Sequence, residues 1–361
     1  MPDDKKLKSK SHPTLDRTKS FIRAHDLNLT DDDLVKCCEE LTIEDDEQRT
    51  DDITCKSSNS SNTTITNKEI LSLSGGGSGC GAIMSALVVI GIKEATDESA
   101  RWSGTSSTEK ILKKRAKAYK NSASTSSSTN NNNDTREIMG SWPNAASSTD
   151  VFVWSSKCTR PGHGSDYPVV KSRGLIPASA KDVVDLIKDS NRVTEYNKMS
   201  IGREDQHVLT QDLNSSIHSM EKCPKMGVPG EAKIMSSKSH PPLVRKPLEF
   251  KTLFYARQLT SEDGVEMDDN GVAYITVGRS VWETPEGTAD GADTSSTRCE
   301  ILLSVNLVRE VTTGNGEKWC ELTLISHGVS PGIPMFVGKQ LALTTAENYI
   351  KDIRALFEKK K

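Results

Sequence analysis

The sequence contains few of the large apolar and aromatic residues that a fully packed chain of its length would need. Only 34% of its 361 residues are hydrophobic and 5% are aromatic, and the mean hydropathy is -0.53. The shortage is concentrated in the first 150 residues. We therefore expect a largely disordered arm with short helical segments over residues 1–149, followed by one folded domain over residues 150–361.

The chain also lacks a large excess of charge, a long apolar run and paired cysteines. Its net charge of -3 is not that of a dedicated nucleic-acid binder. No run reaches the roughly 18 apolar residues that a membrane helix needs. The eight cysteines form no CxxC pair, so we expect free thiols, no metal site and no cofactor. The charged N-terminus lacks a signal-peptide core, which predicts a cytoplasmic protein.

Two stretches of the predicted arm differ from the rest of it. The apolar block 82–92 is too short to span a bilayer, so we expect it to dock on the folded domain or to dip into a membrane surface. The basic stretch 110–120 favours a solvated helix, with peripheral contact to an anionic membrane as the alternative. Residues 121–134 are rich in Ser and Asn and are typical of a linker.

Residue patterns after position 150 predict an antiparallel sheet and two helices. Ser179 is a natural cap for a helix over 179–190, and a second helix of about 24 residues follows Pro334. In segment 298–311 apolar and polar residues alternate, which predicts one buried and one solvated sheet face. The expected strands are 151–154, 167–176, 207–211, 232–240, 250–259, 271–282, 298–311 and 318–327. This order predicts an α+β helix grip, in which a curved sheet wraps around a long C-terminal helix and leaves an internal hydrophobic cavity.

Four segments in this order resemble the START (steroidogenic acute regulatory protein-related lipid transfer) domain family, within the START-like or Bet v 1-like superfamily. The resemblance extends over residues 150–360 and rests on PASAKDVVDLIKDSNRVTEYNK, KIMSSKSHPPLVRKPLEFKTLFYARQL, GVAYITVGRSVWE with TRCEILLSVNLVRE, and SHGVSPGIPMFVGKQ. Tyr196-Asn197 stands where the family has a Trp-Asp/Asn pair. The family's Arg-Asp-Phe is absent, and Glu249-Phe250 or Leu253-Phe254 stands in its place.

The resemblance implies a hydrophobic tunnel for one sterol, phospholipid or similar lipid, with a gate formed by the terminal helix. Arg279 falls in register with the apolar residues of its strand, so it would anchor a polar head group beside Glu249 or Glu300. The alternative is that the register is shifted or that Arg279 lies at a rim. The expected lipid-binding residues, for which plain core packing is the alternative, are Ile275, Val277, Arg279, Ile301, Leu303, Val305, Leu322, Leu324, Phe336, Val337, Gln340, Leu341 and Thr344.

The sequence thus predicts a monomeric, non-enzymatic protein that binds one lipid or sterol-like ligand and transfers or senses it between membranes. Its expected partners are that lipid and, through 82–92 and 110–120, a membrane surface, but no nucleic acid. One alternative is an enzyme, a cyclase or hydrolase, on the same fold, although no inward acid–base pair stands out. The other is a ligand-gated regulatory or interaction module tethered through the N-terminal arm.

Overall fold

The computed structural model describes residues 78–123, 149–159, 164–208, 218, 229–242, 244–267, 271–280, 295–312, 317–331 and 333–359. The expectations for residues 1–77 and 124–148 lie outside this part of the chain.

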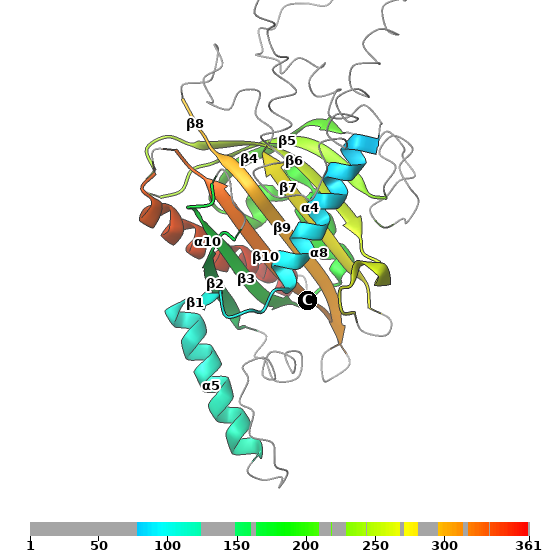
Figure 1. Ribbon diagram of the computed structural model, residues 1–361, viewed down its shortest axis with the longest axis vertical. Coiled ribbons are helices and arrows are strands. Elements are labelled where there is room, and N and C mark those ends of the chain that lie inside the picture. The colour runs from blue at the N-terminus through cyan, green and yellow to red at the C-terminus, as the bar shows by residue number, and fades with distance from the viewer. Residues whose placement is uncertain are drawn as a thin grey trace, which may run out of the picture.

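A ten-stranded sheet forms the centre of the fold (Figure 1). Its strands lie in the order β1-β2-β3-β10-β9-β7-β6-β5-β4, all antiparallel, and the short β8 pairs in parallel with β6. Because β3 pairs with β10, the first strands of the domain lie beside the last. The strands are β1 (Ser103–Gly104), β2 (Val151–Lys157), β3 (Pro168–Ile176), β4 (Ser200–Val208), β5 (Glu231–Ser239), β6 (Leu248–Gln258), β7 (Ala273–Ser280), β8 (Thr297–Arg298), β9 (Glu300–Thr312) and β10 (Lys318–Val329).

Most of these strands coincide with those predicted from residue patterns. The two-residue β1 was not predicted, and β4 ends at Val208, whereas the prediction placed a strand at 207–211. Its sequence SIGREDQHV has no apolar alternation because β4 is an edge strand, pairs only with β5 and is mostly exposed. Two register shifts along that pairing also break the period of two on which the prediction depended.

Helices on one side of the sheet form the grip. They are α8 (Ala180–Lys188), the short turns η2 (Ser190–Arg192) and α9 (Val193–Tyr196), and the 24-residue α10 (Met335–Glu358). The side chain of Ser179 caps α8 by accepting a hydrogen bond from the backbone N–H of Asp182. We call the sheet face that meets α8 and α10 the concave face, and the predicted helix grip is confirmed.

Close approach of α10 to β3 depends on small residues in that strand. The Ser172 hydroxyl donates to the carbonyl of Ala346 at 3.0 Å. A Cβ on Gly174 would lie 2.7 Å from Cγ2 of Ile350, so only glycine leaves room for α10 at this crossing. The helix is therefore anchored to the sheet through its C-terminal half.

The opposite face of the sheet is covered as well, by α4 (Ser78–Thr96). In Figure 1 this helix crosses β7, β9 and β10 on the side away from α10. Met84, Leu87 and Val88 are fully or almost fully buried against apolar residues of these strands. The prediction of one solvated sheet face is therefore wrong, because α4 buries the second face, and the apolar block 82–92 docks on the folded domain.

A second N-terminal helix, α5 (Ser106–Ala123), begins on the sheet and then extends away from it (Figure 1). Ile111 and Leu112 pack near Phe152 at β2, and Arg115 is hydrogen-bonded to the carboxylate of Asp150. Packed structure thus begins well before residue 150, the predicted start of the folded domain.

The remaining turn, η3 (Ser261–Asp263), follows β6.

Candidate functional site

The apolar residues predicted to line a ligand cavity in β7 and β9 face α4 rather than α10. Ile275, Val277, Leu303 and Val305 belong to the core beneath α4, and all are 1% exposed or less. Strand alternation alone does not reveal which face a helix will cover, and the docking of α4 decides it. These four residues therefore lie on the opposite side of the sheet from the concave face.

Arg279 lies on the same α4-facing side as Ile275 and Val277, because it is two residues from Val277 in β7. Its guanidinium donates from Nη1 to the carbonyl of Leu302 at 2.7 Å, and Nη2 lies 3.7 Å from Oε1 of Glu300. Glu300 was one of its two predicted partners. The buried arginine thus contacts groups of β9 and lies away from the concave face.

The β10 residues of the predicted set lie on the concave face. Leu322 and Leu324 belong to the core shared with α8 and α10 and are 0% and 9% exposed. Ile301 is half-buried at the end of β9, opposite Gly328, where a bulge interrupts the pairing of β9 with β10. Contact of these three residues with a lipid stays a prediction.

The first turns of α10 carry the remaining predicted residues and are poorly covered by described residues. Val337 and Leu341 are half-buried, whereas Gln340 and Thr344 are exposed. Phe336 is 76% exposed, beside Met335 at 50%. A row of large apolar side chains at a surface helix end is unusual unless the surface contacts something apolar.

Small and polar residues form a distinct area of the concave face, which we call the concave patch. Cross-strand pairing joins Gly278 to Ser304 and Ser304 to Ser326, so three central strands present almost no side-chain volume along this row. Ser304 and Ser326 are only half-buried although β9 and β10 lie in the middle of the sheet. The patch consists of Thr252, Gly278, Ser304, Asn306 and Ser326, and Phe250 lies next to Thr252 on the same face of β6.

Residue patterns did not predict this patch, because the alternating polar residues of β9 are also typical of a solvated face. Asn306 is only 5% exposed and donates from Nδ2 to Oγ1 of Thr276 in the neighbouring strand at 2.9 Å. Thr252, in β6, is equally buried. The available signal was the predicted length of the terminal helix, since a helix that long must cover one face of the sheet.

A pocket of about 250 Å³ opens where α9 meets α10. Tyr196 and Tyr349 pack edge to face there, with ring centroids 5.5 Å apart, and Asp352 also lines the pocket. Burial raises the pKa of Asp352 and of both tyrosines, so the tyrosines are neutral phenols at physiological pH. The lining residues are Tyr196, Asn197, Lys198, Met199, Thr345, Asn348, Tyr349 and Asp352.

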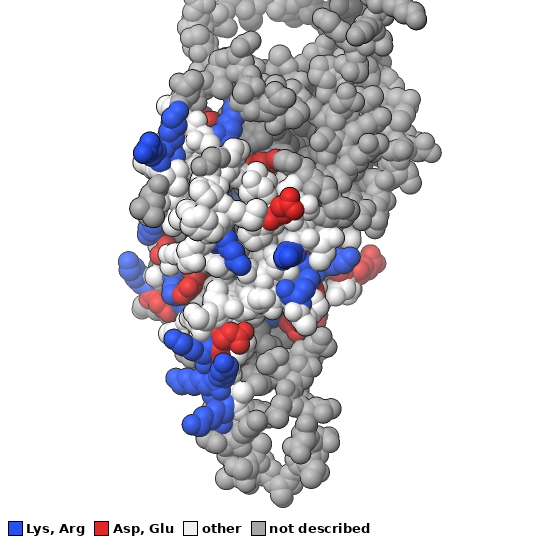
Figure 2. Space-filling model, turned by 60° about the vertical axis from the view of Figure 1, so that its left-hand side comes forward, with Lys and Arg blue, Asp and Glu red and all other residues white. Residues whose placement is uncertain are grey.

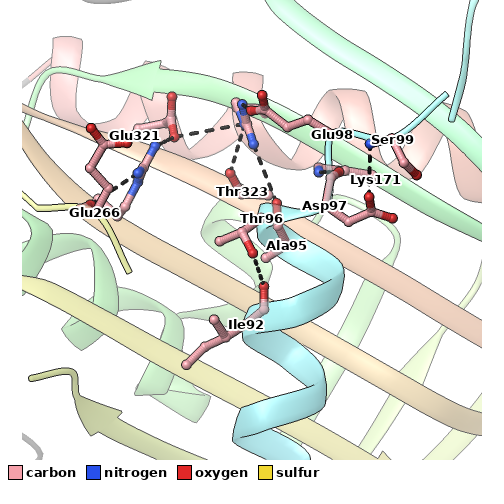
Figure 3. A network of polar contacts seen from close by, with 12 residues as sticks. Ile92, Ala95, Thr96, Asp97, Glu98, Ser99, Lys171, Glu266, Glu321 and Thr323 are labelled. Atoms are coloured by element: carbon pink, nitrogen blue, oxygen red, sulfur yellow. Dashed lines mark hydrogen bonds and ion pairs between the residues drawn. The ribbon is translucent and has the colours of Figure 1, made fainter. Parts of the chain in front are cut away.

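A polar network fixes the C-terminal end of α4 to the sheet (Figure 3). Lys171 donates from Nζ to the carbonyl of Asp97 at 2.7 Å, and Arg173 donates to the carbonyl of Ala95 and to the carboxylate of Glu98. These hydrogen-bond donors meet the carbonyl end of α4, which is the negative end of the helix dipole. Burial, with the nearby charge of Arg173, lowers the pKa of Lys171 to about 7. The network stabilises the docked helix and contributes nothing to the concave face.

Among the described residues no group of three or more His, Cys, Asp or Glu side chains is placed to hold a metal ion. The described helices include none with the length and apolar character that crossing a membrane requires.

Comparison with known proteins finds similar folds among solved structures. Human StAR-related lipid transfer protein 5 is similar over 78% of this chain and 97% of its own, with 10% identity and a TM-score of 0.47. Human STARD10 is similar over 73% of this chain and 75% of its own, with 12% identity and a TM-score of 0.42. A STAR-related lipid transfer protein from Xanthomonas axonopodis is similar over 58% and 93%, with 15% identity and a TM-score of 0.38. No family model and no curated protein matches the chain. The fold itself is the α+β helix grip described above, a ten-stranded and mostly antiparallel sheet with α10 packed against it.

Proposed function

We propose that the protein binds one lipid-sized apolar ligand between the concave patch and the first half of α10, and transfers or senses it without catalysing a reaction. The observation that carries the proposal is the half-burial of Ser304 and Ser326 in central strands of a sheet that is otherwise covered on both faces. Side chains too small to fill the space under a helix leave room for a ligand there. Burying about 300 Å² of apolar ligand surface contributes roughly 7 kcal/mol before association is counted.

Two surfaces support exchange of the ligand with membranes. The exposed Met335 and Phe336 place apolar side chains at the start of the helix that covers the patch. In addition, Lys110, Lys113 and Lys117 are exposed on α5, and Figure 2 shows Lys and Arg gathered at the end of the molecule where this helix extends. Basic side chains beside apolar ones suit an anionic membrane surface.

The test is extraction of the purified full-length protein with organic solvent, followed by mass spectrometry of what was bound. The full chain is required because α4 belongs to the packed structure. One defined lipid at near-stoichiometric amount supports the proposal. No bound lipid, together with no uptake from labelled vesicles, contradicts it. Deleting residues 1–77 then distinguishes transfer from sensing. A carrier keeps vesicle-to-vesicle transfer without these residues, whereas a sensor tethered through them loses its attachment to the membrane.

A further inference from the structure

Two buried oxygens on the concave patch have no hydrogen-bond partner among the described residues. They are Oδ1 of Asn306 and Oγ1 of Thr252, each on a side chain that is 5% exposed. A buried polar atom without a partner destabilises a fold by about 1–3 kcal/mol, so its presence needs a reason. A ligand that supplies the missing hydrogen bond is such a reason.

The position of Asn306 directs its free oxygen toward the proposed ligand. Val305 and Leu307, on either side of it in β9, pack beneath α4, so Asn306 faces the concave side. Its Nδ2 is engaged with Thr276, which leaves Oδ1 as an acceptor. Ser304, two residues along the same face, is half-buried, so the space beside the amide is reachable.

Two cationic side chains near the concave face, Lys233 and Arg203, already have partners. Lys233 donates from Nζ to the carbonyl of Lys188 and to the carboxylate of Asp205, both within 2.8 Å. Arg203 donates to the carbonyl of Ile187 at 2.8 Å. An anionic phosphate has only acceptor oxygens, so it would face another acceptor at Oδ1 of Asn306, and neither of these two cations is free to bind it. A hydroxyl can instead donate a hydrogen bond to that oxygen.

We propose that the ligand is a neutral apolar alcohol whose hydroxyl donates a hydrogen bond to Oδ1 of Asn306. This inference rests on the proposed function, since it names the class of ligand that the concave patch takes. Thr252 lies two strands across and four residues along from Asn306 in the pairing register, a separation on the order of 15 Å. One hydroxyl therefore contacts only one of the two.

The experiment measures binding of two alcohols and their methyl ethers to the full-length protein: dehydroergosterol with its 3-O-methyl ether, and dioleoylglycerol with its O-methyl ether. Dioleoylphosphatidylcholine is the phosphate-bearing probe. We expect at least one alcohol to bind about 10-fold or more tightly than its ether, because the ether leaves the amide oxygen unpaired. In Asn306→Leu the preference falls to about twofold or less, whereas Thr323→Val, at a buried threonine on the α4-facing side of β10, keeps it.

Three results overturn the inference: equal binding of alcohol and ether in both pairs, binding of the phospholipid alone, or an undiminished preference in a folded Asn306→Leu. The comparison within the wild-type protein needs no variant, so a variant that fails to fold does not remove the test. If none of the five probes binds and no lipid is extracted, the proposed function itself fails. If the probes bind but no alcohol is preferred over its ether, the proposed lipid binding is still supported. Only the inference that the ligand is an alcohol is then refuted.

Discussion

Gly91 of α4 lies directly against Val277 of β7. A Cβ added to Gly91 would lie 3.1 Å from Cγ1 of Val277 and 3.2 Å from Cγ2 of Val305, tighter than most contacts in proteins. The glycine therefore sets the distance between α4 and the sheet, and with it the burial of the face whose residues were predicted from the sequence to bind the ligand.

Replacing this glycine with a large side chain tests whether α4 is part of the folded unit. We expect Gly91→Leu to lower the free energy of unfolding by about 1–3 kcal/mol, because the new side chain overpacks the contact with Val277. Urea denaturation followed by circular dichroism measures the change. Val89→Leu is the matched control, since Val89 is 65% exposed on the same helix, and it should shift stability by no more than about 0.5 kcal/mol. Equal effects of the two substitutions would argue against docking of α4.

Lys171 gives the stability of the α4 contact a characteristic pH dependence. Burial lowers its pKa from 10.5 to about 7, so between these pH values the unfolded chain binds a proton that the folded chain does not. The free energy of unfolding contributed by this group therefore rises with pH across that window, by at most about 1.4 kcal/mol per pH unit. Below pH 7 both states are protonated and the contribution is constant.

The measurement compares wild type with Lys171→Met by urea denaturation at pH 7 and pH 9. We expect the wild-type free energy of unfolding to rise relative to that of the variant by about 1–2 kcal/mol between the two pH values. The same comparison with Lys339→Met, an exposed lysine of α10, should show no change. A pH-independent difference for Lys171→Met would mean that the lysine is not desolvated beneath α4.

Glu321 is buried between two arginines on the α4-facing side of the sheet. Arg309 donates to its carboxylate at 2.5 Å, and Nε of Arg173 lies 3.8 Å from it. We expect Arg173→Met to lower the free energy of unfolding by about 2–4 kcal/mol, because it removes the bonds to α4 and leaves the buried carboxylate less compensated. Adding Glu321→Gln should recover part of this loss. If Arg173 and Glu321 do not interact, the effects of the two substitutions should add. The double variant would then be less stable than Arg173→Met by the full effect of Glu321→Gln measured alone.

The exposed apolar residues at the start of α10 predict a role in membrane contact rather than in holding the ligand. We expect the double substitution of Met335→Ser with Phe336→Ser to slow lipid transfer between vesicles by roughly 10-fold, since each side chain would lose its apolar partner. The amount of lipid bound to the purified protein should not change. Val208→Ser, at an exposed residue of the edge strand β4, is the control, and an equal slowing there would remove the special role of α10.

The sequence was sufficient to predict the strands and the terminal helix because each has a strong period. Apolar and polar residues alternate regularly along β9 and β10. Ser179 caps α8, as predicted from its hydroxyl and from Asp182 three residues later. The α4 block was identified as apolar but not as a helix, since residues 82–92 are apolar around most of their circumference and carry little helical periodicity.

The candidate site was harder to predict, for a physical reason. A strand that is buried on both faces offers two sets of side chains, and only tertiary packing decides which set meets which helix. Val305 looked like a ligand residue and Asn306 like a solvated one, yet Val305 packs under α4 and Asn306 is buried on the concave face. Polar residues at a buried position are informative only when the fold shows that water does not reach them.

The most direct test of a ligand on the concave face is photo-crosslinking with a lipid that carries a diazirine in its acyl chain. The full-length protein is loaded from vesicles, irradiated and digested, and the labelled peptides are identified by mass spectrometry. The account predicts labels on β6, β9 and β10 at concave residues such as Phe250 and Ser326, and on the first half of α10. Labels confined to α4 and to the residues beneath it, such as Val277, would place the ligand on the opposite face and contradict the account.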